Sequence, residues 1–456
     1  MPHKSRGACP TIADLPDGWR VRPLGSICAK IGTGATPRGG SEVYLPSRIN
    51  HALFRSQNVF DRHFDADGLA FISATHATEL RNAEVRHGDV LLNITGDGVT
   101  FGRSCIVPDC VPPACLNQHV AIIRPNLQEC DAGYLLSVLT HSAMKGYVES
   151  FNSGGSRRAI TKGHIESFEI PLPPLNVQKS IAAVLGALDD KIELNRRMNA
   201  TVEAMARALF QSWFVDFDPV RAKLDGRQPV GLDKANAAFF PAYFAEDDHG
   251  KLPAGWRRNS IEKICAINAW ALGTNDHLET LEYVEISEVS RGYIANATSY
   301  ARGEEPSRAR RRLRHGDTVL STVRPDRGSY FLALNPPKNR VASTGFAVLT
   351  PTKAPWSFVY AAMTQPEVSD HLGQMADGGA YPAVRPDVIG ALRVAMPGEP
   401  KILEAFHQIC APLFERAEAN RIDSRTLATL RDTLLPKLLS GELSVAESIA
   451  NARVEI

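Results

Sequence analysis

Two long stretches of the chain place apolar residues every three or four positions. The first covers residues 177–214, with no proline and one glycine, and the second covers about 402–439. This spacing predicts two amphipathic helices with a near-heptad seam. We expect Pro412 and Pro436 to kink or end the second helix locally. A helix of this length cannot cover its apolar face alone, so the two most simply pack antiparallel. The alternative is that each helix covers its own globular domain.

The region before each helix alternates short apolar runs with turn residues. We interpret these runs as strands, because they are bounded by glycine, proline and polar residues. The clearest are residues 90–94, 120–123, 283–286, 318–323 and 346–349. Each region closes on a short strand followed by prolines, at 171–174 and 397–400. The pattern therefore predicts an α+β fold in which each mixed α/β region is followed by a long helix.

The two halves of the chain repeat each other. Leu-Pro-Asp-Gly-Trp-Arg at residues 15–20 recurs as Leu-Pro-Ala-Gly-Trp-Arg at 252–257, and Arg-His-Gly-Asp at 86–89 recurs at 314–317. Phe-Glu-Ile at 168–170 matches Leu-Arg-Val at 392–394, and Asn195-Arg196 matches Asn420-Arg421. Four markers in the same order, each offset by roughly half the chain, indicate a tandem duplication.

The duplication sets the expected domain boundaries. We predict a first globular domain at 1–174, a long helix at 175–215 and a linker at 216–251. A second globular domain follows at 252–400, a second long helix at 401–440 and a C-terminal tail at 441–456. The linker prediction rests on weak periodicity and several turn residues, among them Pro219, Gly226 and Pro241.

Composition and charge narrow the picture. The 456 residues carry a formal net charge of +1, so basic patches have to be sought locally. No apolar run has the length of a membrane span, and the first ten residues lack the apolar core of a signal peptide. We expect a cytoplasmic protein.

Cys105, Cys110 and Cys115 are evenly spaced, but no histidine stands at metal-ligand spacing beside them. Ordinary reduced thiols are the favoured interpretation over a structural metal.

Familiar catalytic motifs are missing from the sequence. It contains no dinucleotide or S-adenosylmethionine loop, no phosphate loop and no hydrolase or zinc-protease motif. Asp89 and Asp97 are near each other, and we favour turn caps over Mg²⁺ ligands for both. His87 and His315 stand in the repeated Arg-His-Gly-Asp motif, which resembles a turn before a strand, so we interpret both as structural.

Basic residues gather in two places. Five arginines fall within residues 308–314, and two more follow at 324 and 327. Arginine suits bidentate contact with phosphate or guanine, although a solvated face remains an alternative. In the first repeat a Gly-Gly loop continues as Ser156-Arg157-Arg158 with Lys162 nearby. The matching loop of the second repeat carries Tyr381 and Arg385. Asn117-Gln118 could contact adenine edges, or could cap a turn.

Several motifs resemble the specificity (S) subunit family of Type I restriction–modification systems. They are Ile170-Pro-Leu-Pro-Pro174 with Gln178, the stretch from Leu209 to Pro219, Gly226-Arg-Gln-Pro-Val230, and the stretch from Leu434 to Gly441. The resemblance covers nearly the whole chain. It implies two target-recognition domains separated by two long helices packed as an antiparallel coiled coil.

The resemblance also implies a function. Each recognition domain would read one half of an asymmetric bipartite site in double-stranded DNA, and the helices would set the spacing. The helices would also dock two methyltransferase subunits, which carry S-adenosylmethionine. Endonuclease–translocase subunits, which use ATP and Mg²⁺, would join this core. The chain itself would be non-catalytic and hold no cofactor. The expected DNA-binding residues are Asn117, Gln118, Gly155, Ser156, Arg157, Arg158, Lys162, Arg308, Arg310, Arg311, Arg312, Arg324, Arg327, Tyr381 and Arg385.

Two other functions stay open at this stage. A stand-alone DNA-modifying or DNA-cleaving enzyme with an unfamiliar site would act on DNA without partners. A pure protein-interaction scaffold would not depend on Arg310, Arg311 and Arg312.

Overall fold

The chain folds into two compact units, each with one globular region and part of two long helices. The computed structural model describes residues 15–152, 157–247, 250–273, 276, 278–379 and 381–443. The units divide at Asn195/Arg196 and at Arg421/Ile422. These divisions fall inside α5 (Leu175–Phe210) and α12 (Pro400–Leu439). The predicted boundaries instead gave each helix a segment of its own.

The central sheets of the two units have the same strand order. All neighbouring strands in both sheets are antiparallel. The first sheet runs β2 (Cys28–Thr33), β11 (Val120–Pro125), β7 (Val90–Asn93), β9 (Ser104–Ile106), and the second runs β17 (Cys265–Ile267), β26 (Phe346–Pro351), β23 (Asp317–Ser321), β24 (Tyr330–Ala333). The strands predicted near residues 90, 120, 318 and 346 are therefore confirmed.

A second sheet in each unit extends the correspondence. The first unit has the order β10 (Ala114–Leu116), β3 (His51–Phe54), β6 (Ala70–Ile72), and the second has β21 (Thr298–Ala301), β18 (Thr280–Val284), β25 (Arg340–Ser343), β22 (Ala309–Arg312). One parallel pair occurs in each, β3 with β10 and β18 with β25. The shared topology confirms the tandem duplication.

Short ladders and helices complete the two units. The two-stranded ladders are β1 (Arg20–Pro23) with β13 (Glu169–Leu172), β4 (Val59–Phe60) with β5 (His63–Phe64), β8 (Thr95–Gly96) with β12 (Arg158–Ala159), β16 (Arg257–Ser260) with β27 (Arg393–Met396), β19 (Val289–Ser290) with β20 (Tyr293–Ile294), and β14 (Phe244–Asp247) with β15 (Gly250–Pro253). The shorter helices are α1 (Ala74–Glu79), α2 (Ala132–Thr140), α3 (Ser142–Ser150), α4 (Lys162–Glu166), α6 (Asp218–Leu224), α7 (Lys234–Phe239), α8 (Ile261–Ile264), α9 (Trp356–Met363), α10 (Pro366–Gln374) and α11 (Pro386–Ala391).

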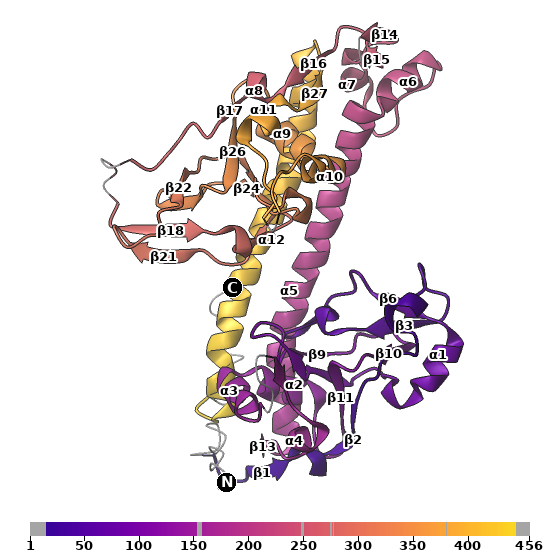
Figure 1. Cartoon of the computed structure of the whole chain (residues 1–456), viewed down its shortest axis with the longest axis vertical. Helices are drawn as coiled ribbons and strands as arrows, with labels where there is room; N and C mark the ends of the chain where they lie inside the picture. Colours follow the sequence, from indigo (N-terminus) through magenta and orange to yellow (C-terminus); the bar gives the residue numbers. More distant parts are fainter. Residues whose placement is uncertain are drawn as a thin grey trace. The chain divides into compact units, whose positions relative to one another are not determined.

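The two long helices pair antiparallel within each unit (Figure 1). In the first unit Asp189 of α5 contacts Arg431 of α12, and Asn195 contacts Asp423. In the second unit Asn199 bonds to the carbonyl of Ala417, and the rings of Phe210 and Phe406 lie 6.1 Å apart. Residue numbers fall along α12 as they rise along α5, so the predicted antiparallel coiled coil is confirmed.

The same helices also cover the globular regions. Ile181 and Leu185 of α5 and Leu438 of α12 belong to the core that contains Val90 and Ile123 of the first sheet. In the second unit Phe406 belongs to the core that contains Leu349. Both interpretations of the apolar stripes are therefore correct. Each long helix packs against the other helix and also covers a globular region.

Of the two outcomes expected at Pro412 and Pro436, a local kink or a local end, the end does not occur. The helix continues through both prolines to Leu439. A proline inside a helix costs about 3 kcal/mol, whereas burial of one large apolar side chain contributes roughly 1.5–3 kcal/mol. Buried residues flank both sites, with Cys410 and Phe414 around the first and Leu435 and Leu438 around the second. Packing on both sides offsets the two missing backbone hydrogen bonds.

Residues 216–247 and 250–251 belong to the second unit, within the segment predicted as a linker. They contain α6, α7, β14 and the start of β15. The rings of Trp213 and Phe240 pack 5.2 Å apart, and those of Phe217 and Trp256 lie 5.6 Å apart. These aromatic residues are too widely spaced to give a periodic signal. Among the described helices, none is long and apolar enough to cross a membrane.

Candidate nucleic-acid interface

The repeated Arg-His-Gly-Asp motif is a turn that starts a central strand. The Asp89 carboxylate accepts a hydrogen bond from the backbone N–H of Arg86 at 2.7 Å, before β7. Asp317 accepts the same bond from Arg314 at 2.7 Å, before β23. The predicted turn is confirmed in both repeats. In each repeat the aspartate carboxylate closes the turn by accepting from the backbone three residues earlier, so the motif has a structural role.

Asp97 also caps a turn, as predicted. Its Oδ1 accepts hydrogen bonds from the backbone N–H groups of Thr100 at 2.8 Å and Val99 at 3.0 Å. The bonds from Thr100 and Val99 lower the pKa of Asp97. Within the described residues, no group of three or more His, Cys, Asp or Glu could hold a metal ion.

Three loops of the first unit meet beyond the ends of its central strands. The backbone N–H of Ile94 bonds to the carbonyl of His119 at 3.0 Å, and that of Ile160 bonds to the carbonyl of Ile94 at 3.0 Å. These bonds join the loop after β7, the loop before β11 and the segment of β12. We call this set of loops cluster 1. Gln118 directly precedes His119, and Arg157 lies close enough to His119 for its charge to lower the pKa of that histidine.

The second unit builds an equivalent cluster with the same backbone bonds. The N–H of Thr322 bonds to the carbonyl of Gly345 at 2.9 Å, and that of Val384 bonds to the carbonyl of Thr322 at 2.9 Å. We call this set of loops cluster 2. Thr322 corresponds to Ile94, Gly345 to His119 and Val384 to Ile160. The two repeats thus share one backbone frame for their loops.

The predicted residues Asn117 and Gln118 have different roles in cluster 1. Asn117 is 7% exposed, and its Oδ1 accepts a hydrogen bond from the backbone N–H of His119 at 3.1 Å. Ser343 makes the equivalent bond to Gly345 at 3.2 Å in the second unit. Asn117 is therefore the turn cap that the alternative interpretation described. The Gln118 side chain is exposed and bonds to the Thr36 hydroxyl.

His119 and Thr95 complete the polar surface of cluster 1. The Thr95 hydroxyl contacts His119 Nδ1, and Gln118 Nε2 lies 3.1 Å from His119 Nε2. Burial, and then the charge of Arg157, lowers the pKa of His119. Neither residue was among those predicted to bind DNA. The position of His119 directly after Asn117-Gln118 was the available signal.

The basic loop of the first repeat is partly anchored by acids. Arg158 pairs with Glu149 at 2.5 Å, and Lys162 pairs with Glu166 at 3.4 Å inside α4. The Arg157 side chain is exposed beside cluster 1. The predicted residues Gly155 and Ser156 lie outside the described residues.

The arginines of β22 do not form one free basic stripe. Arg312 pairs with Asp276 at 2.6 Å, and Arg310 lies 3.5 Å from Glu305. Arg311 is half-buried on the same strand, and burial lowers its pKa. These partners come from other loops, so their proximity could not be read from the run of arginines.

Other predicted arginines do gather at cluster 2. The guanidinium of Arg324 lies 4.9 Å from the ring centroid of Tyr381, whose side chain is 74% exposed. The carbonyl of Arg308 accepts a bond from the N–H of Thr344 at 2.8 Å, and Arg327 is exposed in the turn after Arg324. Arg385 starts α11 and pairs with Asp387 at 3.1 Å.

Trp270 and Arg314 form a second aromatic–arginine contact that the sequence analysis did not select as a site. The guanidinium of Arg314 lies 3.1 Å from the Trp270 ring centroid, and both residues are exposed. Flat arginine and aromatic surfaces can stack on bases, and arginine also binds phosphate.

Comparisons with known proteins agree with one another. Residues 16–204 match the family model described as the Type I restriction modification DNA specificity domain. The Type I restriction enzyme HindI specificity subunit of Haemophilus influenzae is 25% identical over 411 residues, which cover 79% of this chain and 87% of the relative. The MjaIX specificity subunit of Methanocaldococcus jannaschii is 22% identical over 442 residues, which cover 96% of each chain.

A solved structure shares the fold. The S subunit of a Type I restriction–modification system from M. genitalium aligns with a TM-score of 0.53 at 15% identity. The alignment covers 92% of this chain and 96% of that one.

Proposed function

The chain belongs to the specificity-subunit family of Type I restriction–modification systems, and we propose that it gives such a system its DNA sequence preference. Each globular region acts as a target-recognition domain and reads one half of an asymmetric bipartite site. The paired helices set the spacing between the halves and dock two methyltransferase subunits.

One observation carries this proposal. Clusters 1 and 2 have the same backbone hydrogen bonds but different side chains on that frame. His119, Gln118 and Arg157 stand in cluster 1 where Gly345, Thr344 and Tyr381 stand in cluster 2. Sequence is read by side chains at base edges, whereas backbone and charge position the protein. A common frame with different side chains is suited to reading two different half-sites.

Base and phosphate contacts divide among the candidate residues by chemistry. Gln118 offers an amide that matches the adenine edge, and the half-buried Arg324 offers a fork that matches guanine or phosphate. Arg308 and Arg327 are exposed and suit phosphate contacts that fix orientation.

The partners and cofactors follow from the same proposal. The chain is a non-catalytic subunit that binds double-stranded DNA in the cytoplasm. Two methyltransferase subunits supply S-adenosylmethionine chemistry, and endonuclease–translocase subunits supply ATP- and Mg²⁺-dependent chemistry. This chain binds no cofactor of its own.

The test is to map methylated adenines in the genome of cells that carry the complete system. We expect one asymmetric motif with two defined halves and a spacer of fixed length. The purified complex of this chain with its methyltransferase partner should then protect that site in a footprint. A complex with no preference for any gapped site over random DNA would contradict the proposal, as would DNA cleavage or methylation by this chain alone.

A further inference from the structure

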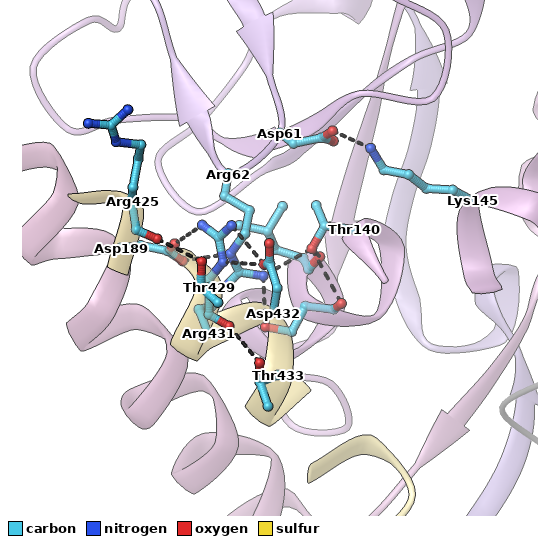
Figure 2. Close-up of polar contacts among 12 residues, drawn as sticks. Asp61, Arg62, Thr140, Lys145, Asp189, Arg425, Thr429, Arg431, Asp432 and Thr433 are labelled. Atoms are coloured by element: carbon cyan, nitrogen blue, oxygen red, sulfur yellow. Dashed lines mark hydrogen bonds and ion pairs between the residues drawn. The ribbon is translucent and has the colours of Figure 1, made fainter. Parts of the chain in front are cut away.

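The β4–β5 hairpin of the first recognition domain reaches α5. Arg62 stands in its two-residue turn, and its side chain is only 6% exposed. Its Nε lies 2.6 Å from Oδ2 of Asp189 on α5. Its Nη1 donates to the Thr140 hydroxyl at 3.0 Å and to the Ser137 hydroxyl at 3.2 Å, both on α2 (Figure 2). The guanidinium thus joins the hairpin, α2 and a long helix.

The carboxylate of Asp189 is shared with the second long helix. Its Oδ1 accepts a hydrogen bond from Arg431 Nη1 of α12 at 2.8 Å. Arg431 also pairs with Asp432 at 2.8 Å. Asp189 therefore lies between a guanidinium from the recognition domain and one from the other helix. Charged hydrogen bonds that are largely shielded from water have well-defined geometry and are strong.

The backbone at Arg62 is unfavourable for arginine. Its φ is +60°, in the left-handed region that glycine adopts most readily. The equivalent β19–β20 hairpin has Gly292 at the second turn position, with φ +85°. A Cβ at Gly292 would lie 2.9 Å from the hydroxyl oxygen of Tyr360 on α9 and 3.2 Å from Nη2 of Arg421 on α12. The second hairpin approaches its helix pair through backbone, whereas the first extends a long charged side chain.

We propose that Arg62 is a positioning residue, which holds the first recognition domain on the helix pair through Asp189 and thereby fixes the spacer length that the complex accepts. This inference rests on the proposed function. Arg62 need not contact DNA. It acts by restricting the angle at which the first domain presents cluster 1 to one half-site.

The test compares variants of the full chain in complex with its methyltransferase partner. Arg62→Gly removes the side chain and introduces glycine, which is the residue best suited to the left-handed backbone at this position. Asp189→Asn weakens the same contact from the helix side. The control is Lys145→Gln, because Lys145 pairs with Asp61 of the same hairpin (Figure 2). Among the described residues, no hydrogen bond or ion pair joins the Lys145 side chain to a long helix. Each complex is titrated with the mapped site and with sites whose spacer is one base pair shorter or longer.

We expect Arg62→Gly to lower the preference for the native spacer about tenfold, or about 1.4 kcal/mol. The base preference within each half should not change. Asp189→Asn should have a similar effect, and the double variant should lose less than the sum of the two, because the two residues share one contact. Lys145→Gln should keep the native spacer preference.

Three results would overturn the inference. They are an unchanged spacer preference in both Arg62→Gly and Asp189→Asn, an equal loss of affinity for every spacer, and an equal effect of Lys145→Gln. Failure of the proposed function is distinguishable from all three, because the wild-type complex itself would then show no preference for a gapped site.

Discussion

Asp89 and Arg124 form a bidentate ion pair inside the first recognition domain. Arg124 Nε lies 2.6 Å from one carboxylate oxygen, and Nη2 lies 2.7 Å from the other. The second domain keeps the aspartate as Asp317 but has Thr350 on β26 where Arg124 stands on β11. Asp317 is fully buried, and this burial raises its pKa to about 6 from 3.8.

The raised pKa of Asp317 predicts a pH-dependent stability. The folded state binds the proton more tightly than the unfolded chain, so the stabilisation is complete below about pH 4 and is lost as pH rises through about 6. Asp317→Asn should remove this loss. Its free energy of unfolding relative to wild type should increase by about 1.4 kcal/mol between about pH 5 and pH 8, because about half of the loss has already occurred by pH 5. Denaturant titrations at the two pH values measure the difference.

The matched control is Asp89→Asn. This change leaves Arg124 without its charged partner, so we expect lower stability at both pH values. Equal pH dependence in Asp317→Asn and wild type would contradict the prediction.

Asn199 and Asn420 link the two long helices in the second unit. Nδ2 of Asn420 donates to Oδ1 of Asn199 at 2.8 Å. Buried asparagines in coiled coils fix register at some cost in stability. Asn420→Leu alone should therefore destabilise the chain by about 1 kcal/mol, because it removes one partner of a part-buried bond. The double variant with Asn199→Leu should recover part of that loss in thermal melting.

Thr426→Ala is the control for the asparagine pair. The exposed Thr426 hydroxyl bonds only within α12, to the carbonyl of Ile422 at 3.2 Å, among the contacts of the described residues. We expect its melting temperature to stay near that of wild type. A loss equal to that of Asn420→Leu would argue against the register role.

The arginines should divide into two groups when DNA binding is measured against salt. Arg308→Ala and Arg327→Ala each remove an exposed charge and should lower the salt slope by about 1, with weaker binding to every sequence. Arg312→Ala removes a charge already paired with Asp276 and should leave the slope nearly unchanged. A slope change in Arg312→Ala equal to that in Arg327→Ala would show that the ion pair opens on DNA.

Substitution of Gln118 and substitution of its neighbour Asn117 should have different effects on DNA binding. Gln118→Ala should relax base preference in one half of the site only. Thr344→Ala, at the matching place in cluster 2, should affect only the other half. Asn117→Ala removes the turn cap and should lower thermal stability with a uniform loss of affinity. Selection of bound sites from a randomised pool distinguishes these outcomes.

Local and repeated patterns in the sequence already determined the duplication, the α+β class, the two long helices and most central strands. Periodicity and turn chemistry act over a few residues, so they can be read without coordinates. The turn roles of Asp89 and Asp97 followed in the same way. The aromatic residues of 216–247 are too widely spaced to give a periodic signal, so their packing could not be predicted. The local proline rule allowed an end at Pro412, but the helix continues there because buried residues flank that position.

Tertiary structure alone decided which polar residues are available to DNA. Arg312 is paired by Asp276, and Asn117 is buried as a cap, while Arg308 and Gln118 stay exposed. Arg62 belongs to no recognised sequence motif, yet it forms an ion pair with Asp189, which is more than a hundred residues away in the sequence. A charge interacts with whatever the fold places within a few ångströms, and that neighbourhood is set by the packing of the whole unit.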